Sequence, residues 1–312
     1  MELFETDAAG YTQIFPSTYH LYNSVDFNVL NEERCDQLLF LVFKDSRNRV
    51  GLIAGVKNNE LHTPFSAPFG GFSFTKDNTT LLQLEGCIDA LIKYVASKGY
   101  AAVHYTMPPL FYNKLFNNKL LNVFFRKDFQ IISLDLNYEF DLEGMKGDYD
   151  TTLWYNAKKN LRIANKQDFV CIKCETESNI LEAYTVIQEN RERKELPLKM
   201  TFDQVRKTAD IITADFFLLR KGTDNVAAAQ VFHVAPGIVQ VIYWGDIPDF
   251  ASYKPMNFLA AYIFNYYKAL GIKYIDIGPS TQQSIPNYGL CEFKESIGCG
   301  VSAKYSLKYS NK

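Results

Sequence analysis

The sequence lacks any apolar stretch approaching the roughly 18 residues that a membrane-spanning helix needs. Nothing near Met1 combines a basic segment, an apolar run and a small-residue cleavage site, as a secretory signal would. It also lacks an excess of either charge, with 33 Lys and Arg against 35 Asp and Glu. We therefore expect a cytoplasmic protein with no membrane span and no DNA partner, although a local basic face remains open.

Cysteine and histidine are sparse and scattered. The six cysteines have neither the density nor the spacing of a disulfide scaffold, and we expect reduced thiols. Cys171 and Cys174 form one CxxC, but the surrounding residues indicate a strand, which would place the two thiols on opposite faces. No second pair completes four zinc ligands. We propose no metal site, because the four histidines show no metal-ligand spacing: His20, His62, His104 and His233.

Apolar and aromatic residues are abundant. Of the 312 residues, 47% are hydrophobic and 15% are aromatic. That composition is typical of a folded protein, and the length favours two domains, each able to bury its own core.

The first half contains a hairpin, with strands at 38–43 and 50–56 joined by a polar turn. An extended segment reaches about residue 74. Apolar residues at helical spacing then predict a helix over 80–97, and a short strand follows at 101–105.

The second half repeats this order at an offset of about 175 residues. Strands are predicted at 216–220, 226–234 and 238–244, then a helix from Pro255 to about residue 270, then a strand at 272–277. We predict two related lobes, each a mixed, mostly antiparallel sheet flanked by helices, facing across a cleft. Sequence identity between the two halves is low, so it stays open that two unrelated α/β halves are alike in element order by chance.

We place the N-terminal lobe at 1–147 and the C-terminal lobe at 148–312. The region 151–212 contributes three interlobe helices. The first is capped by Asp150 or Thr151 and runs to about Lys166, and the others cover 178–192 and 202–212.

Three segments near the carboxyl end carry a resemblance. Residues 274–280 (YIDIGPS), 287–290 (NYGL) and 293–298 (FKESIG) resemble the closing signature of the FemAB-like acyltransferases. Residues 158–166 (KKNLRIANK) and 190–194 (NRERK) resemble the basic helix and the Arg-bearing segment of that family. The matching segments span about residues 150–300, and the first lobe matches chiefly in topology and at 68–71 (PFGG).

The resemblance implies two tandem lobes of the N-acetyltransferase (GNAT) fold, within the acyl-CoA N-acyltransferase superfamily. Well-known members pass an amino acid from aminoacyl-tRNA to an amine of a peptidoglycan precursor, and sister groups use acyl-CoA. It implies an acyltransferase of the bacterial cell envelope that binds no cofactor, uses aminoacyl-tRNA or acyl-CoA as co-substrate, and acts by direct attack without metal. The acceptor would be a small molecule or a nucleotide-sugar.

Two other functions stay open. One is acyl-CoA-dependent N-acetylation of a small molecule, and the other is a non-catalytic tandem lobe that binds a nucleotide-sugar. The loop 245–254 lacks the Arg/Gln-x-x-Gly-x-Gly/Ala pattern that cradles a pyrophosphate, which disfavours acetyl-CoA. In this fold two strands splay to expose N–H groups to the donor, and we expect these to be 226–234 and 238–244.

Lys294 and Asp276 are the candidate catalytic residues. The resemblance makes Lys294 a partner of a phosphate or of the charge that develops at the reacting carbonyl, a role that suits a point charge. Asp276 ends a strand, where it would hold the acceptor amine, take its proton or cap the following loop.

Eight further residues are candidates for substrate binding. Those at four-residue spacing on the first interlobe helix share a face that would meet phosphates, and the two aromatic strand residues would wall a pocket. Each is equally compatible with an ordinary surface or core position. They are Lys158, Arg162, Arg191, Arg193, Tyr243, Trp244, Lys254 and Phe293.

Overall fold

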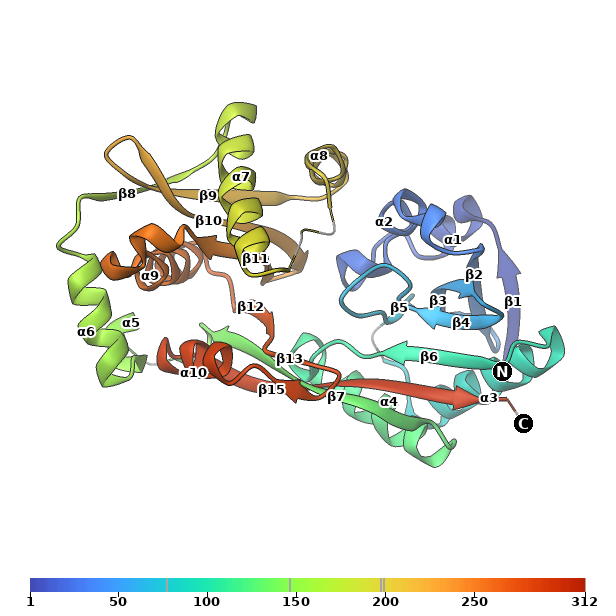
Figure 1. Cartoon of the computed structure of the whole chain (residues 1–312). Coiled ribbons are helices and arrows are strands. Elements are labelled where there is room, and N and C mark those ends of the chain that lie inside the picture. The colour runs from blue at the N-terminus through green and yellow to red at the C-terminus, as the bar shows by residue number, and fades with distance from the viewer. Residues whose placement is uncertain (77, 146, 197, 199, 312) are drawn as a thin grey trace. The chain divides into compact units, whose positions relative to one another are not determined.

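The computed structural model describes residues 1–76, 78–145, 147–196, 198 and 200–311, and its chain divides into two compact units. The first unit comprises residues 1–136, 282–285 and 302–312, and the second comprises 137–281 and 286–301 (Figure 1). The division between lobes at 147 and 148 stays a prediction.

The main strands form one 13-stranded sheet with the order β1-β2-β3-β4-β6-β15-β7-β12-β11-β10-β9-β8, and β5 pairs with β3. The first unit contains the run from β1 to β15 and the part of β7 up to Leu136. Neighbouring strands are antiparallel, except that β4 and β6 run parallel. The strands are β1 (Glu2–Thr6), β2 (Gln37–Lys44), β3 (Asn48–Lys57), β4 (Glu60–Thr63), β5 (Phe72–Phe74), β6 (Ala102–Thr106) and β15 (Gly300–Ser310).

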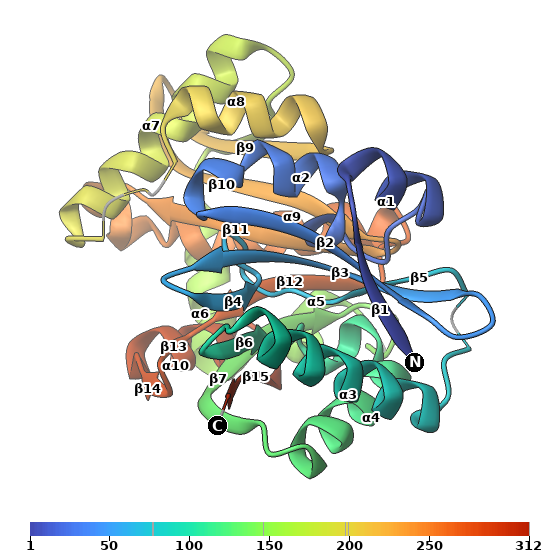
Figure 2. The same cartoon turned by 90° about the vertical axis from the view of Figure 1, so that its right-hand side faces the viewer.

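Alternating side chains of β2 and β3 enter two different cores. Leu41 and Leu52 pack with α3 (Leu81–Lys98) and α4 (Lys114–Arg126), whereas Val42 and Ile53 pack with α1 (Ala8–Ile14) on the other face (Figure 2). The helix α3 begins with a capping box between Thr80 and Gln83. Shorter helices are α2 (Val25–Leu30), η1 (Leu21–Asn23), η2 (Glu32–Arg34) and η3 (Leu110–Tyr112).

The second unit contains the rest of this sheet, from residue 137 of β7 through β12, β11, β10 and β9 to β8, and among these described strands only β11 and β12 are parallel neighbours. The strands of this run are β7 (Gln130–Asp141), β8 (Phe169–Lys173), β9 (Ala214–Lys221), β10 (Asp224–Ala235), β11 (Ile238–Asp246) and β12 (Tyr274–Pro279). Two short strands, β13 (Thr281–Gln282) and β14 (Ile285–Pro286), form a separate pair.

Helices cover both faces of this sheet. Phe217 and Leu219 of β9 pack into a core with α9, and the intervening Phe216 and Leu218 pack with α7 (Figure 1). The helices are α5 (Tyr149–Thr152), α6 (Tyr155–Ala164), α7 (Glu177–Arg193), α8 (Phe202–Ile211), η4 (Pro248–Tyr253), α9 (Pro255–Ala269) and α10 (Tyr288–Ser296). None of the helices in the described ranges is long and apolar enough to cross a membrane.

The predicted repeat and fold class are confirmed: β2-β3-β4-α3-β6 in the first unit has the order and pairing of β9-β10-β11-α9-β12 in the second. The last strands are exchanged. The strand β7 follows α4 of the first unit but pairs with β12, and β15 follows α10 of the second unit but pairs with β6. Each run of strands therefore includes a strand from the other half of the sequence.

The single helix predicted up to Lys166 is wrong in two respects. Leu153 and Trp154 are extended and separate α5 from α6, because the Trp154 N–H donates to the Ser296 carbonyl oxygen at 2.9 Å. The helix α6 then ends at Ala164, so Lys166 lies beyond it.

Candidate active site

The two parallel strands of the second unit diverge. The two strands, β11 and β12, are paired over three residues each, from Ile238 with Tyr274 to Gln240 with Asp276. Beyond Gln240, β11 continues to Asp246, and β10 is its only partner among the described strands. The expectation that β10 and β11 splay is wrong, because this antiparallel hairpin stays paired from Ala227–Asp246 to Ala235–Ile238. The separation lies instead between β11 and β12, beyond Gln240 and Asp276, where their parallel pairing ends.

Asp276 lies at the point of divergence and is fully buried. Its Oδ1 accepts hydrogen bonds from Asn137 Nδ2 and the Gly278 N–H, each at 2.8 Å, and its Oδ2 accepts one from Gln240 Nε2 at 2.8 Å. A buried carboxylate is stable when such donors satisfy it. Asp276 therefore links β7, β11 and β12 through hydrogen bonds. No pattern in the sequence indicated Asn137 or Gln240 as its partners.

Lys294 of α10 is 2% exposed and forms hydrogen bonds with the end of β12. Its Nζ donates to the carbonyl oxygens of Ile277 at 3.0 Å, Gly278 at 2.8 Å and Pro279 at 3.2 Å. Gly278 has a φ of 73°, the left-handed region that glycine adopts without strain, and this bends the strand end. Burial lowers the pKa of Lys294 to about 8, against the opposing effect of nearby acidic groups that include Asp276.

Two of the predicted aromatic residues meet beside this lysine. The ring of Trp244, on the diverging part of β11, lies 6.1 Å from that of Phe293, the neighbour of Lys294 on α10. Both side chains are partly exposed. We call Asp276, Lys294, Trp244 and Phe293 the β12 site.

Tyr243 points to the other face of β11, because neighbouring strand residues alternate. The guanidinium of Arg191 lies 5.5 Å from its ring centre, and Arg191 Nε donates to the Leu196 carbonyl oxygen. Arg193 is ion-paired with Glu189 at 2.5 Å and with Asp249 at 3.4 Å. Both arginines lie in the last turn of α7.

A buried contact that the sequence did not reveal fixes the same part of β11. Asn190 of α7 donates from Nδ2 to the Asp246 carbonyl oxygen at 2.6 Å. A Cβ on Gly245 would lie 2.4 Å from the Asn190 side chain, so only glycine permits this approach.

The first turn of α9 offers fewer unbonded backbone N–H groups than a helix N-terminus that binds an anion. Pro255 has no N–H, and the N–H groups of Asn257 and Phe258 both donate to the Lys254 carbonyl oxygen, at 3.1 and 3.4 Å. Lys254 itself has a φ of 60° and caps the helix through its backbone. The arrangement leaves little room for a pyrophosphate to bind backbone amides here.

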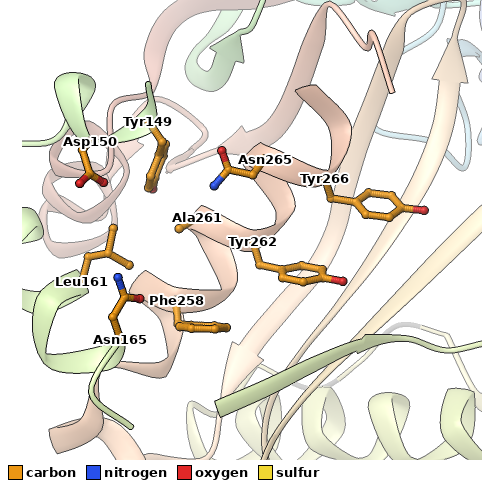
Figure 3. Close-up of a pocket in the computed structure, with 9 residues that line it drawn as sticks. All are labelled: Tyr149, Asp150, Leu161, Asn165, Phe258, Ala261, Tyr262, Asn265 and Tyr266. Atoms are coloured by element: carbon orange, nitrogen blue, oxygen red, sulfur yellow. The ribbon is translucent and has the colours of Figure 1, made fainter. Parts of the chain in front are cut away.

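Lys158 and Arg162 lie on α6, away from the β12 site residues in sequence and on a different element. A cavity of about 360 Å³ lies beside this helix, between α5, α6 and α9 (Figure 3). The hydroxyl of Tyr149 is buried and has no hydrogen-bond partner within the described ranges. The cavity is lined by Tyr149, Asp150, Leu161, Asn165, Phe258, Ala261, Tyr262, Asn265 and Tyr266.

No family model and no curated protein sequence matches the chain. Its fold is similar to that of FemX, with a TM-score of 0.70 at 12% identity, covering 99% of this chain and 97% of that one. It is similar to L-PGS from Bacillus licheniformis, with a TM-score of 0.64 at 14% identity, covering 99% and 93%. A tandem GNAT protein from the clavulanic acid biosynthesis pathway gives 0.51 at 5% identity, covering 100% and 98%.

These similarities confirm the predicted fold. The chain has the tandem GNAT arrangement that the FemAB-like resemblance implied, which is a transferase fold. Identities of 5–14% speak for the fold alone.

Proposed function

We propose that this chain is a FemAB-like acyltransferase that moves an aminoacyl or acyl group to an amine of a cell-envelope precursor or sugar. The observation that carries the proposal is the gap between β11 and β12, with a buried lysine at the end of β12. FemX and L-PGS, which share the fold over nearly their whole length, support the same substrate class.

The chemistry is direct attack. The amine nitrogen forms a bond to the acyl carbonyl carbon, the ester bond to the donor oxygen breaks, and that oxygen takes the proton that the amine loses. Every second N–H of β11 points away from β10 and into the gap, where it is available to stabilise the carbonyl oxygen as negative charge develops. The reaction needs no covalent enzyme intermediate and no metal.

In this proposal Lys294 and Asp276 are positioning residues. Asp276 sets the point at which the strands diverge, and Lys294 holds three carbonyl groups of the strand end turned towards α10. Its positive charge also favours negative charge that develops nearby. Trp244 and Phe293 would border the reacting groups, and Arg191, Tyr243, Arg193 and Lys254 remain candidates for binding the remoter parts of a substrate.

The first turn of α9 favours aminoacyl-tRNA over acyl-CoA as donor, because Pro255 has no N–H and the Asn257 N–H is already bonded to the Lys254 carbonyl oxygen. Lys158 and Arg162 would contact phosphates of the donor. The neighbouring cavity, whose walls include Phe258 and Tyr262, suits a planar ring of the same molecule.

Thermal stabilisation by a ligand panel tests the choice of substrates, since a ligand at 100 times its Kd adds about 2.7 kcal/mol to the stability of the folded state. The panel holds acetyl-CoA, longer acyl-CoAs, UDP-sugars and charged tRNA. We expect a raised Tm with charged tRNA or UDP-sugars and none with CoA esters. A shift with CoA esters alone would make this a small-molecule N-acyltransferase, and binding without any transfer would leave a non-catalytic nucleotide-sugar binder.

A further inference from the structure

A row of polar side chains crosses three strands of the first unit. Figure 1 shows these strands, β4, β6 and β15, in the first unit. His62 of β4 pairs in register with His104 of β6, which pairs with Lys308 of β15. Glu60 precedes His62 by two residues and shares its face of the sheet. The opposite face carries Leu61, Val103 and Leu307, which pack in the core with α3 and α4.

The ligand-type atoms of three of these side chains converge. Glu60 Oε2 lies 2.9 Å from His104 Nε2 and 3.9 Å from His62 Nε2, and all three atoms lie within 4.8 Å of one another. The two imidazole rings are stacked, with centres 4.5 Å apart. Each side chain is about one quarter exposed, so solvent and a small ion can reach the cluster.

We propose that Glu60, His62 and His104 bind a divalent transition-metal ion, and Zn²⁺ is the ion that we expect. Two imidazole nitrogens and one carboxylate oxygen form a ligand set that zinc uses when it keeps a fourth position for water or a ligand. Tetrahedral ligands at zinc bond lengths lie about 3.4 Å apart, a value between the two distances to Glu60 Oε2. Binding requires the stacked rings to turn until both nitrogens face the ion.

The positive charge of Lys308 affects how tightly the site would bind a metal ion. Its Nζ bonds Glu60 Oε1 at 2.9 Å, which orients the carboxylate and leaves Oε2 for the metal. Its positive charge also repels a cation at Oε2. Removal of this charge with little change in side-chain length should therefore tighten metal binding.

No metal site was predicted from the sequence, because His62 and His104 are 42 positions apart along the chain. Only the parallel pairing of β4 with β6, across the connection through α3, places them side by side. The alternative role of the cluster is an ion-pair network of Glu60, His104 and Lys308 that holds the strands together.

The test is titration of chelator-treated, tag-free full-length protein with Co²⁺, read by its visible absorption, and with Zn²⁺, read by calorimetry. We expect one ion per chain and cobalt bands of low-symmetry, four-coordinate type. Each of Glu60→Gln, His62→Gln and His104→Gln should weaken binding at least about tenfold, and Lys308→Met should strengthen it severalfold. His233→Gln, which changes a histidine of the second unit, is the matched control and should bind as the wild type.

Circular dichroism and Tm establish that each variant is folded, and zinc should raise the Tm of the wild type but not of the triple variant Glu60→Gln/His62→Gln/His104→Gln. Wild-type affinity in that triple variant, or binding of less than one ion per wild-type chain at saturation, would overturn the proposal and leave the ion-pair network.

Discussion

A lysine that is 2% exposed is costly, because burial disfavours its charged form. Lys294 keeps three carbonyl partners, which an ammonium group can satisfy with its three N–H bonds. A neutral amine has only two, so deprotonation releases one of the carbonyl groups of Ile277, Gly278 or Pro279. The protonation state of this single residue therefore controls the shape of the end of β12.

The first prediction concerns stability against pH. Burial lowers the pKa of Lys294 to about 8 in the folded protein, below the ordinary lysine value of 10.5 that applies when it unfolds. Between these values the unfolded chain binds more protons, so the free energy of unfolding rises with pH. Compared with Lys294→Met, the wild type should gain up to roughly 3 kcal/mol between pH 8 and 10.5 in urea unfolding. A difference that stays constant across this range would contradict the buried charge.

The second prediction concerns activity. Lys294→Met should lower kcat at least about tenfold with a smaller change in KM, because the strand end loses its geometry. Wild-type kcat should fall as pH rises through about 8, and the variant should lack this step. Lys273→Met, which removes an exposed lysine paired with Glu143, is the control and should retain activity.

At the scale of elements, the diverging end of β11 depends on α7. Gly245→Ala should push Asn190 away from the Asp246 carbonyl oxygen and destabilise the protein by about 1–3 kcal/mol. Gly289→Ala on α10, where a Cβ meets only Asn287 Oδ1 at 3.7 Å, should be neutral or slightly stabilising. Urea unfolding compares the two, and equal stability of both variants would show that the contact between α7 and β11 is not tight.

The cations of α6 supply a prediction that depends on the tRNA donor. Replacement of Lys158 and Arg162 by Ala should weaken binding of charged tRNA and reduce the slope of log K against log salt by about 1 to 2. Lys159→Ala on the same helix is a single-charge comparison. An unchanged slope in the double variant would show that α6 does not contact the phosphates of the donor.

Local pattern predicted the hairpins, α3, α7, α8 and α9 because periodicity and capping are sequence-local signals. Pro255, predicted and found at the start of α9, shows this directly. The partners of Asp276 were not predictable in the same way, since Asn137 lies 139 positions away and joins it only through the pairing of β7 with β12. The helix α4 and the strands β7 and β15 received no assignment from sequence, and two of these are the exchanged strands.

At the scale of the whole molecule, the exchanged strands link the stability of each unit to a distant part of the chain. Leu307 of β15 is 1% exposed and packs in the core of the first unit. Leu307→Ala should destabilise that unit by about 2–5 kcal/mol and increase hydrogen exchange in β6 and α3. Val301→Ala, on the same strand but 48% exposed, should have little effect. Faster exchange confined to residues 300–310 would contradict the exchange of strands.

The central claim is transfer of an acyl group at the β12 site. The most direct measurement follows a radiolabelled amino acid from a pool of charged tRNAs into cell-envelope precursors and amino sugars, with the wild type, Lys294→Met and Lys273→Met side by side. We predict label in an amine-linked product with the wild type and Lys273→Met, and at least about tenfold less with Lys294→Met. Equal labelling by all three proteins, or labelling only from acyl-CoA donors, would contradict the account.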